Sequence, residues 1–595
     1  MKKIILNTLT AAAFTAALAL GANAATFTVT KTADTNDGVC DADCSLREAI
    51  FAANNAAGDD VIEFASGSFG SASTITLTSG EMTISANGSL TINGPGAHLL
   101  TLDGNLASRI MTVNRDVVAN ISGLRFTRGN GVGAINTGRG GALYNVGGTI
   151  VVSDCIFEGN AGANGGAFNN AAAASPSVPA TATYINCVFR NNTATGSGGV
   201  GQNFSTSFLT IRDSTFTGNS SGASIGAGAL QANGQVRITN STFFNNTAAD
   251  GGGGAIQTNG SLFILTNSTI VGNTALDQAG GLHRGTTNVN AFVRNSIIAG
   301  NTGGGGSPDV SNSTGGLTSE GTNIIGVVGT STGWIGSDIL NTDPQLTPIG
   351  NHGGLGHTFA LLSSSPARNA GQNCVVDLSC PTNNPEAAVT TDQRGAARPF
   401  GASVDIGSFE DSTTYVAVLP DAPLGVPYDV LLTPESAGFT YNVTAGQLPP
   451  GITINADTAM PDKKGAAPQA ALSLTGTPTT PGVYQFTITI SEVNAGTNSA
   501  SVNYQITVPG AAANVSVSGF VSNGGISVLP NSIVSITDGS TTWTTRTNNF
   551  GYYSFEGLPA NIQYTITVLS KGYTFSPVQI TPSGDVTGLI ISPNP

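Results

Sequence analysis

The chain has 595 residues, of which 79 are glycine, 39% are apolar and only 9% are charged. This length exceeds one ordinary hydrophobic core, while the glycine content and low charge exclude a mainly helical enzyme and a charged disordered chain. The net charge of −14, with no basic cluster beyond the first residues, excludes nucleic acid as a partner, because its phosphates would be repelled.

The first residues have the pattern of an export signal. Lys2 and Lys3 precede a short apolar run, and the sequence Ala-Asn-Ala at 22–24 supplies the small residues at which such signals are cleaved. We therefore predict a signal peptide over residues 1–24 and a mature chain that starts near Ala25. No later run of about 18 apolar residues follows, so we expect no transmembrane segment.

A short helix is predicted from "CSLREAIFAANN" at residues 44–55. Ser45 and Glu48 form a capping box, and the helix after them has one apolar face, composed of Leu46, Ala49, Ile50 and Ala53. The preceding loop holds two cysteines that an exported chain can oxidise, Cys40 and Cys44. The same loop holds four candidate calcium ligands, Asp34, Asp37, Asp41 and Asp43. This stretch is similar to the CSLREA-motif module of exported β-helix proteins, which implies a cap over residues 25–64.

A repeat dominates the middle of the chain. Its copies are "CIFEGN", "CVFRNN", "STFTGN", "STFFNN", "STIVGN" and "SIIAGN", which end at Asn160, Asn192, Asn219, Asn246, Asn273 and Asn301. The spacings of these asparagines are 32, 27, 27, 27 and 28 residues, a period in the range of solenoids. Alternating apolar residues precede each copy and a glycine-rich step follows it, which predicts strands and turns and excludes helical repeats.

In a coil with this period, equivalent residues of successive turns lie about 4.8 Å apart. Stacked phenylalanines such as Phe189, Phe216 and Phe243 can fill its interior, and the stacked asparagines can adopt left-handed backbone and share hydrogen bonds along the axis. Cys155 stacks on Cys187 in the same register, so a disulfide and a pair of buried thiols are both open.

The repeat resembles the right-handed parallel β-helix of the pectate-lyase type and the repeats of polymorphic outer-membrane proteins. We assign residues 65–411 to this body. Its last part is similar to the carboxyl-terminal segment of the choice-of-anchor β-helix family, and it holds another candidate disulfide, Cys374 with Cys380. The residues that carry this second likeness are Asp343, Pro344, Pro366, Ala367, Asn369, Gly371, Asp392, Arg394, Gly395, Arg398, Pro399, Asp405, Ile406, Gly407 and Glu410.

Two β-sandwich domains are predicted after the β-helix. Residues 412–510, with "LPPGITI" and "LSLTGTPTTPGVYQFTITI", resemble immunoglobulin-like domains related to cadherin-like modules. Some relatives bind calcium, for which Glu492 and Asn494 are the nearest matches. Residues 511–595 look like a carboxypeptidase regulatory-like domain, in which Tyr553 and Phe555 alternate on one face and are interpreted as core residues, with a platform for sugars as the alternative.

One group of residues in the repeat could carry chemistry. Asp250 and Asp277 each lie four residues after the asparagine of their copy, and His283 and Arg284 follow shortly. Two carboxylates about 5 Å apart would suit a retaining glycosidase or a calcium site. The alternative is that these aspartates are solvated residues of turns.

Two hypotheses on function follow. The first is a non-catalytic protein, exported or on the surface of a bacterial cell, that acts in adhesion or binds a polysaccharide, a cell-surface glycan or another partner. The second is a carbohydrate-active enzyme, a polysaccharide lyase or glycoside hydrolase, that uses a groove on the β-helix. Calcium is the one cofactor that either hypothesis would involve.

Overall fold

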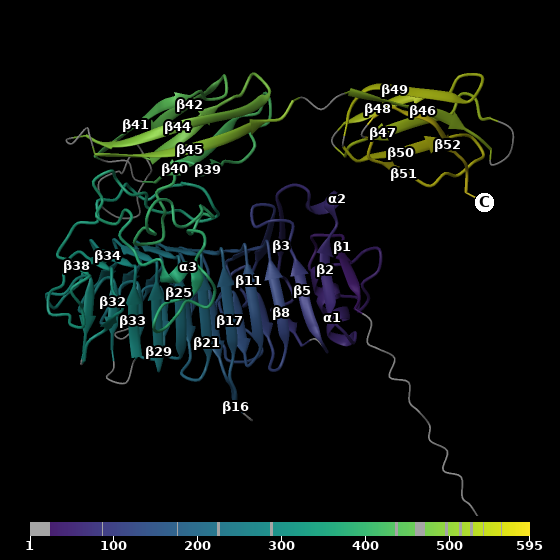
Figure 1. The fold of residues 1–595 in the computed structure, drawn as a ribbon. Coiled ribbons are helices and arrows are strands. Elements are labelled where there is room, and N and C mark those ends of the chain that lie inside the picture. The colour runs from purple at the N-terminus through teal and green to yellow at the C-terminus, as the bar shows by residue number, and fades with distance from the viewer. Residues whose placement is uncertain are drawn as a thin grey trace, which may run out of the picture. The chain divides into compact units, whose positions relative to one another are not determined.

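The structure is a computed structural model that describes residues 24–594 except 86, 175–176, 223–225, 286–289, 314, 435–437, 458–470, 494–497, 511–513, 524–527, 540, 561 and 583. It divides into two compact units, Met1–Thr342 and Asp343–Pro595. The predicted fold class is confirmed, because a parallel β-solenoid is followed by β-sandwich regions and helices are few (Figure 1). Over the described ranges, no helix is long and apolar enough to cross a membrane. The predicted signal peptide lies outside the described residues, apart from Ala24.

The first unit winds through four parallel sheets, which we call sheets I to IV. Sheet I contains β1 (Thr26–Val29), β2 (Asp60–Phe64), β5 (Ser89–Asn93), β8 (Val118–Ser122), β11 (Thr149–Ser153), β17 (Thr181–Ile185), β21 (Phe208–Arg212), β25 (Gln235–Thr239), β29 (Leu262–Thr266), β33 (Asn290–Arg294) and β36 (Thr318–Ser319). Sheet II contains β4 (Met82–Ile84), β7 (Met111–Val113), β10 (Leu143–Val146), β14 (Phe168–Ala171), β20 (Gly201–Asn203), β24 (Leu230–Ala232), β28 (Ile256–Thr258), β32 (Leu282–Arg284) and β35 (Val310–Asn312).

Two further sheets complete the solenoid. A hairpin of β15 (Ala173–Ala174) and β16 (Ser177–Val178) is inserted between β14 and β17. Sheet III contains β3 (Ser73–Thr76), β6 (Leu100–Asp103), β9 (Arg125–Thr127), β12 (Ile156–Glu158), β18 (Val188–Arg190), β22 (Thr215–Thr217), β26 (Thr242–Phe244), β30 (Thr269–Val271), β34 (Ile297–Ala299), β37 (Ile324–Ile325) and β38 (Ile339–Leu340). Sheet IV contains β13 (Ala161–Gly162), β19 (Thr193–Ala194), β23 (Ser220–Ser221), β27 (Thr247–Ala248) and β31 (Thr274–Ala275).

Left-handed residues make the sharp corners of each turn of the solenoid. Between sheets I and III the corner residue is in most turns an asparagine or aspartate, such as Asn240 with φ 49° and Asn267 with φ 45°. Between sheets III and IV it is asparagine or glycine, such as Asn245 or Gly272. The last asparagine of each copy was predicted to adopt this conformation, and that prediction is wrong. The left-handed residue is the one before it, which leaves the last asparagine free to point inward.

Stacked apolar residues fill the interior, as the period predicts. The rings of Phe126, Phe157, Phe189, Phe216 and Phe243 lie nearly parallel, with centroids 4.3 to 5.0 Å apart. Isoleucines continue this column from Phe243 onward, because Phe243 pairs with Ile270 and Ile270 with Ile298. One buried apolar core thus runs through the first unit.

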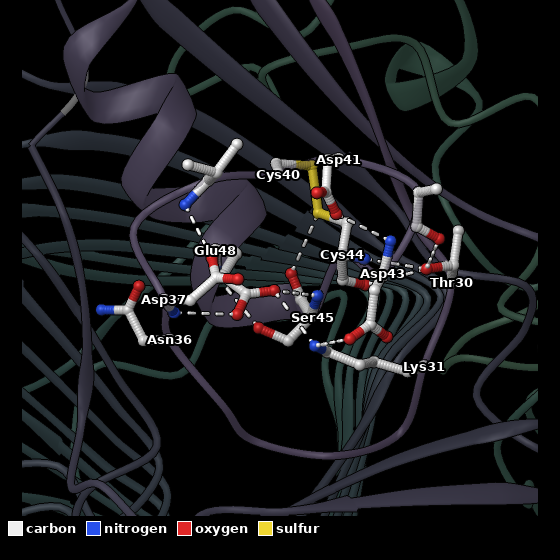
Figure 2. The surroundings of a disulfide bond; sticks show 12 residues. Thr30, Lys31, Asn36, Asp37, Cys40, Asp41, Asp43, Cys44, Ser45 and Glu48 are labelled. Carbon is white, nitrogen blue, oxygen red and sulfur yellow. Dashed lines mark hydrogen bonds and ion pairs between the residues drawn. A yellow bond between two sulfur atoms is a disulfide. The ribbon is translucent and has the colours of Figure 1, made fainter.

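A helix covers the first turn of this core. Helix α1 (Leu46–Asn55) buries Leu46, Ala49, Ile50 and Ala53, and its capping box is formed, since Ser45 Oγ accepts from Glu48 N at 3.1 Å and Glu48 Oε2 accepts from Ser45 N at 2.7 Å. The disulfide Cys40–Cys44 closes the loop before it, as Figure 2 shows. A second short helix, α2 (Ser66–Phe69), follows β2. At the other end of the solenoid, Trp334 packs against the core and its indole donates to Ser331 Oγ.

The second unit begins with a segment of few regular elements, residues 343–411, with one short helix, α3 (Cys374–Asp377). A buried ionic network holds it together. Arg394 donates twice to Asp392 and stacks on Phe409, while Arg398 lies 3.6 Å from Glu410. This segment also hydrogen-bonds to the sandwich that follows, through Tyr504 Oη to Asn351 O, Thr433 Oγ1 to Ile349 O and Ser363 N to Ser499 O. Residues 343–411 had been predicted to belong to the body of the solenoid.

Two sandwiches complete the second unit. The first packs β39 (Val416–Val418), β45 (Ser499–Val508), β44 (Gly482–Glu492) and β41 (Phe439–Gly446), called sheet V, against β40 (Tyr428–Thr433), β43 (Ala471–Gly476) and β42 (Ile452–Asp457). The second packs β49 (Tyr552–Pro559), β46 (Asn514–Val521) and β52 (Val586–Ile591), called sheet VI, against β48 (Thr542–Arg546), β47 (Ile533–Thr537), β50 (Tyr564–Leu569) and β51 (Val578–Ile580). Tyr553 and Phe555 lie in the second core, as predicted.

Candidate functional site

The two aspartates of the repeat lie in turns between sheets IV and II. Thr247 pairs with Thr274 and Ala248 with Ala275, so Asp250 and Asp277 follow equivalent positions of neighbouring strands. The Asp250 carboxylate accepts a hydrogen bond from Gly251 N, its own neighbour, at 3.0 Å. Asp277 is exposed, and its backbone lies against the next turn at Gly304. The register therefore aligns the strands before the two aspartates, while each carboxylate follows the conformation of its own turn.

His283 and Arg284 lie in a strand instead, on β32 in sheet II. His283 is in register with Gln257 on one side and Ser311 on the other. Its Nδ1 lies 2.8 Å from Ser311 Oγ, and its Nε2 lies 3.4 Å from Ser313 Oγ. Burial lowers the pKa of His283 to about 4, so the imidazole is neutral at pH 7. Arg284 is buried and lies against Gly315.

The contacts of these four residues explain how the turns and the sheet pack, and they do not form a pair of groups for proton transfer. A glycosidase needs two carboxylates on either side of a sugar bond, whereas the carboxylate of Asp250 bonds within its turn and His283 bonds to Ser311 of the next strand. The residues of the predicted site thus come from separate elements. The polar row that contains His283 was not predicted, although "LQA", "IQT" and "LHR" recur every 26 residues, at 230, 256 and 282.

Each of the four aspartates of the amino-terminal loop has its own partner. Figure 2 labels three of these aspartates, Asp37, Asp41 and Asp43. Asp34 is buried against Arg47, at 2.7 Å. Burial alone would raise its pKa, but Arg47 and the amides of Thr78 and Ser79 hold that pKa below its usual value. Asp37 and Asp41 accept from the backbone of their own turns, and Asp43 pairs with Lys31 at 3.0 Å. Over the described ranges, no group of three or more His, Cys, Asp or Glu is placed to hold a metal ion. Of the possible ligands in the sandwich, Glu492 accepts from Asn498, and Asn494 lies outside the described residues.

The six cysteines divide into two disulfides and two thiols. Cys40 bonds to Cys44 and Cys374 to Cys380, with Cα atoms 4.6 and 4.7 Å apart. The third candidate pair is not bonded, because Cys155 and Cys187 are free and buried. The Cys187 thiol donates to Val152 O at 3.5 Å instead, and burial raises the pKa of Cys155 to about 12. Both occupy the position at which later turns have Ser214 and Ser241, whose hydroxyls accept from the backbone of the preceding turn.

The last asparagines of the copies form a continuous hydrogen-bonded ladder inside the solenoid. From Asn192 onward, the Oδ1 atom of each one accepts from both the backbone N and the Nδ2 of the asparagine one turn earlier, at 2.8 to 3.2 Å, while Asn160 Oδ1 accepts from Gly129 N at 2.9 Å. The ladder runs through Asn160, Asn192, Asn219, Asn246, Asn273 and Asn301, and Asp309 accepts at its end. Such a ladder satisfies buried backbone groups at a corner where no strand pairs, so its role is structural.

An exposed aromatic face on the last sandwich was not foreseen. Phe520 on β46 pairs with Tyr552 on β49 and with Ile590 on β52, so the three side chains lie side by side on the outer face of sheet VI. The rings of Phe520 and Tyr552 have centroids 5.4 Å apart, and both residues are 36% exposed. Ile590 is 65% exposed, and Phe550 in the adjoining turn is 74% exposed. We call these four residues the aromatic face.

The outer face of sheet V offers a different surface, made of uncharged polar side chains. Gln485 donates to Gln505 at 2.9 Å and Thr487 to Asn503 at 2.9 Å, across β44 and β45. A shallow hollow of about 230 Å³ adjoins them, where the register of β41 shifts between Val443 and Ala445. Amides and hydroxyls of this kind can both donate and accept, which suits neutral polar ligands.

Comparison with family models identifies both sandwiches. Residues 401–509 match the family described as "Putative Ig domain", and residues 516–591 match the carboxypeptidase regulatory-like domain. The chain therefore carries an Ig-like domain and a carboxypeptidase regulatory-like domain after its β-solenoid. The first match includes residues 401–411, part of the segment that hydrogen-bonds to the sandwich. The aromatic face lies within the second match.

Solved structures give only distant likenesses. BcpA, the major pilin subunit of Bacillus cereus, is 12% identical with a TM-score of 0.17, over 29% of this chain and 67% of that one. A variant of the same pilin gives 12% identity and a TM-score of 0.18, over 30% and 67%. The Bacillus anthracis TIE protein is 9% identical with a TM-score of 0.13, over 28% of this chain and 41% of that one. No curated protein matches the chain.

Proposed function

We propose that this chain is an exported, non-catalytic surface protein that binds glycans through the aromatic face of its carboxypeptidase regulatory-like domain. The observation that carries this proposal is the placement of Phe520, Tyr552 and Ile590 in register on an outer sheet face, where all three stay partly exposed to solvent. Exposed apolar side chains that cluster, rather than scatter, mark interaction surfaces. Aromatic rings suit sugars, because the C–H face of a pyranose stacks on them while its hydroxyls stay in water.

In this proposal the solenoid is a rigid support for the glycan-binding domain. Its asparagine ladder and phenylalanine column link each turn to the next, so that a load on one end passes along the axis. We further propose that residues 25–64 are a CSLREA-type cap, and that residues 343–411 are a choice-of-anchor-like segment that joins the solenoid to the Ig-like domain.

The test uses the mature chain, residues 25–595, on a glycan array and on insoluble polysaccharides. We expect binding to a defined set of glycans and a loss of that binding in Phe520→Ala and Tyr552→Ala. Tyr573→Ala, which alters another exposed tyrosine of the same domain, is the matched control and keeps the binding.

The enzymatic alternative is tested with the same protein. Incubation with acidic and neutral polysaccharides, followed by assays of reducing ends and unsaturated products, gives no turnover under the proposal. Turnover that is lost in Asp250→Ala or Asp277→Ala would contradict it and place a catalytic site on the solenoid.

A further inference from the structure

A buried carboxylate beside the first described residues has only one of its two oxygens bonded. Asp60, at the start of β2, is 1% exposed. Its Oδ1 atom accepts from the backbone nitrogen of Ala25 at 2.9 Å. Its Oδ2 atom is buried, and no hydrogen bond reaches it from any residue that the structure describes. A buried carboxylate in this state is costly, because burial removes water from a charge that nothing neutralises.

The parallel pairing of β1 with β2 fixes Ala25 at this place. Thr26 pairs with Val61, and Val61 N donates to Ala25 O at 2.8 Å, so the nitrogen of Ala25 has to lie next to Asp60. In the unprocessed chain that nitrogen belongs to a peptide bond and has one hydrogen. It can therefore bond to one oxygen of the carboxylate and carries no positive charge.

Export changes the chemistry of this nitrogen. The sequence Ala-Asn-Ala at 22–24 predicts cleavage of the bond between Ala24 and Ala25 by a signal peptidase. In that hydrolysis one water is consumed: its hydroxyl completes the carboxyl group of Ala24, and its hydrogen goes to the nitrogen of Ala25. The new amino group takes up a further proton at neutral pH, because the ordinary pKa of an α-amino group is about 7.7 to 8.0.

We infer that the α-ammonium of Ala25 in the processed chain forms a buried ion pair with Asp60, and that removal of the signal peptide thereby completes the amino-terminal cap. The ammonium has three hydrogens, enough to reach both Oδ1 and Oδ2 and still pair with a neighbour. The pair would anchor β1, which is the edge strand of sheet I and lies beside α1. A chain that begins at Ala25 would therefore be more stable than one that begins earlier, because only its terminal ammonium is placed to pair with Asp60.

This inference rests on the export part of the proposed function and not on glycan binding. It is tested with four full-length mature proteins: residues 25–595 beginning at Ala25, the same chain with Gly-Ser added before Ala25, and both chains with Asp60→Asn. The thermal midpoint of the solenoid is measured by calorimetry, and the reactivity of the α-amine by acylation with an N-hydroxysuccinimide ester and mass spectrometry.

We expect the Gly-Ser extension to lower the midpoint by a few °C, and to lower it no further once Asp60→Asn is present. The amine of Ala25 should react about tenfold more slowly in the unmodified protein than in Asp60→Asn, because the ion pair keeps it protonated. Asp59→Asn alters the exposed neighbouring carboxylate, which accepts from Ser89 N at 3.0 Å and from Ser89 Oγ at 2.8 Å, and we expect it to leave the reactivity of the Ala25 amine unchanged.

Two results would overturn the inference. One is an equal midpoint and equal amine reactivity for the Asp60 and Asp60→Asn proteins that begin at Ala25. The other is an exported protein whose amino-terminal sequence starts at a residue other than Ala25. A failure of glycan binding affects neither measurement, so the two proposals are separable.

Discussion

Replacement of Asn246 by alanine would remove one complete step of the asparagine ladder. Asn246 Oδ1 accepts from Asn219 N at 3.2 Å and from Asn219 Nδ2 at 2.8 Å. Its own Nδ2 donates to Asn273 Oδ1 at 2.8 Å and to Phe216 O at 2.9 Å. All four bonds are buried, so water cannot replace them without opening the turn.

The magnitude follows from these four bonds. At about 1 kcal/mol net for each, their loss would cost about 4 kcal/mol, and the buried groups left without partners raise that figure. Because 1.4 kcal/mol corresponds to a factor of ten, the local opening equilibrium should rise by about 10³. Opening at one turn breaks the contacts between neighbouring turns, which are the only long-range contacts that a solenoid has.

Hydrogen–deuterium exchange with mass spectrometry measures this effect in the intact protein, where a single unfolding midpoint would mix several domains. Asn245→Gly is the matched control. Asn245 is exposed with φ 54°, and glycine occupies the equivalent corner at Gly218 and Gly272, so this change should leave exchange unaltered or slower. Equal exchange around residues 216–246 in Asn246→Ala and Asn245→Gly would refute the view that the ladder holds the turns together.

Further predictions concern the buried acid, the thiols and the end segment. Burial, aided by Asp405 and opposed by Arg398, raises the pKa of Glu410 to about 7 from an ordinary 4.5. Its stabilising contribution is therefore complete below pH 4.5 and lost as pH rises toward 7, by at most about 3 kcal/mol. In thermal unfolding between pH 4.5 and 7, the unmodified protein should lose more stability than Glu410→Gln. Stability curves that run parallel against pH would contradict a raised pKa of Glu410. Cys155 and Cys187 should resist thiol reagents in the native protein and react when it is unfolded, as counted by mass spectrometry; labelling of the native protein would show that the thiols are not buried. A protein of residues 343–595 should unfold at a higher temperature than one of residues 412–595, since the latter loses the bonds to Asn351 and Ile349; equal midpoints would show that the segment does not support the sandwich.

The repeat period made the solenoid predictable, but not the conformation of each corner. A period of 27 residues aligns equivalent positions, and this was enough to place the phenylalanine column, while the helical spacing of apolar residues after Ser45 was enough to give α1 its buried face. It could not say which of two adjacent residues turns left-handed, because asparagine suits both roles. The corner is Asn245 and the ladder is Asn246, a difference that depends on which side chain reaches the next turn.

The candidate sites were harder to predict, for two reasons. Asp250 and Asp277 follow aligned strands, but turns of different length connect them to β28 and β32, so the strand register does not fix their carboxylates. The aromatic face depends on which residues of β46, β49 and β52 lie opposite one another, which the connecting segments decide. Alternation along one strand placed Tyr553 inward, and hence Tyr552 outward, but no local pattern places Phe520 beside it.

The central claim is most directly tested by the affinity of the mature chain for the best glycan of the array. Stacking of a sugar on two rings, at about 1 kcal/mol for each ring, predicts that the double substitution Phe520→Ala and Tyr552→Ala raises Kd more than tenfold while the sandwich stays folded. Tyr573→Ala should leave Kd unchanged. Equal affinity of the double variant and the unmodified chain, or binding to no glycan at all, would contradict the proposed role of the aromatic face.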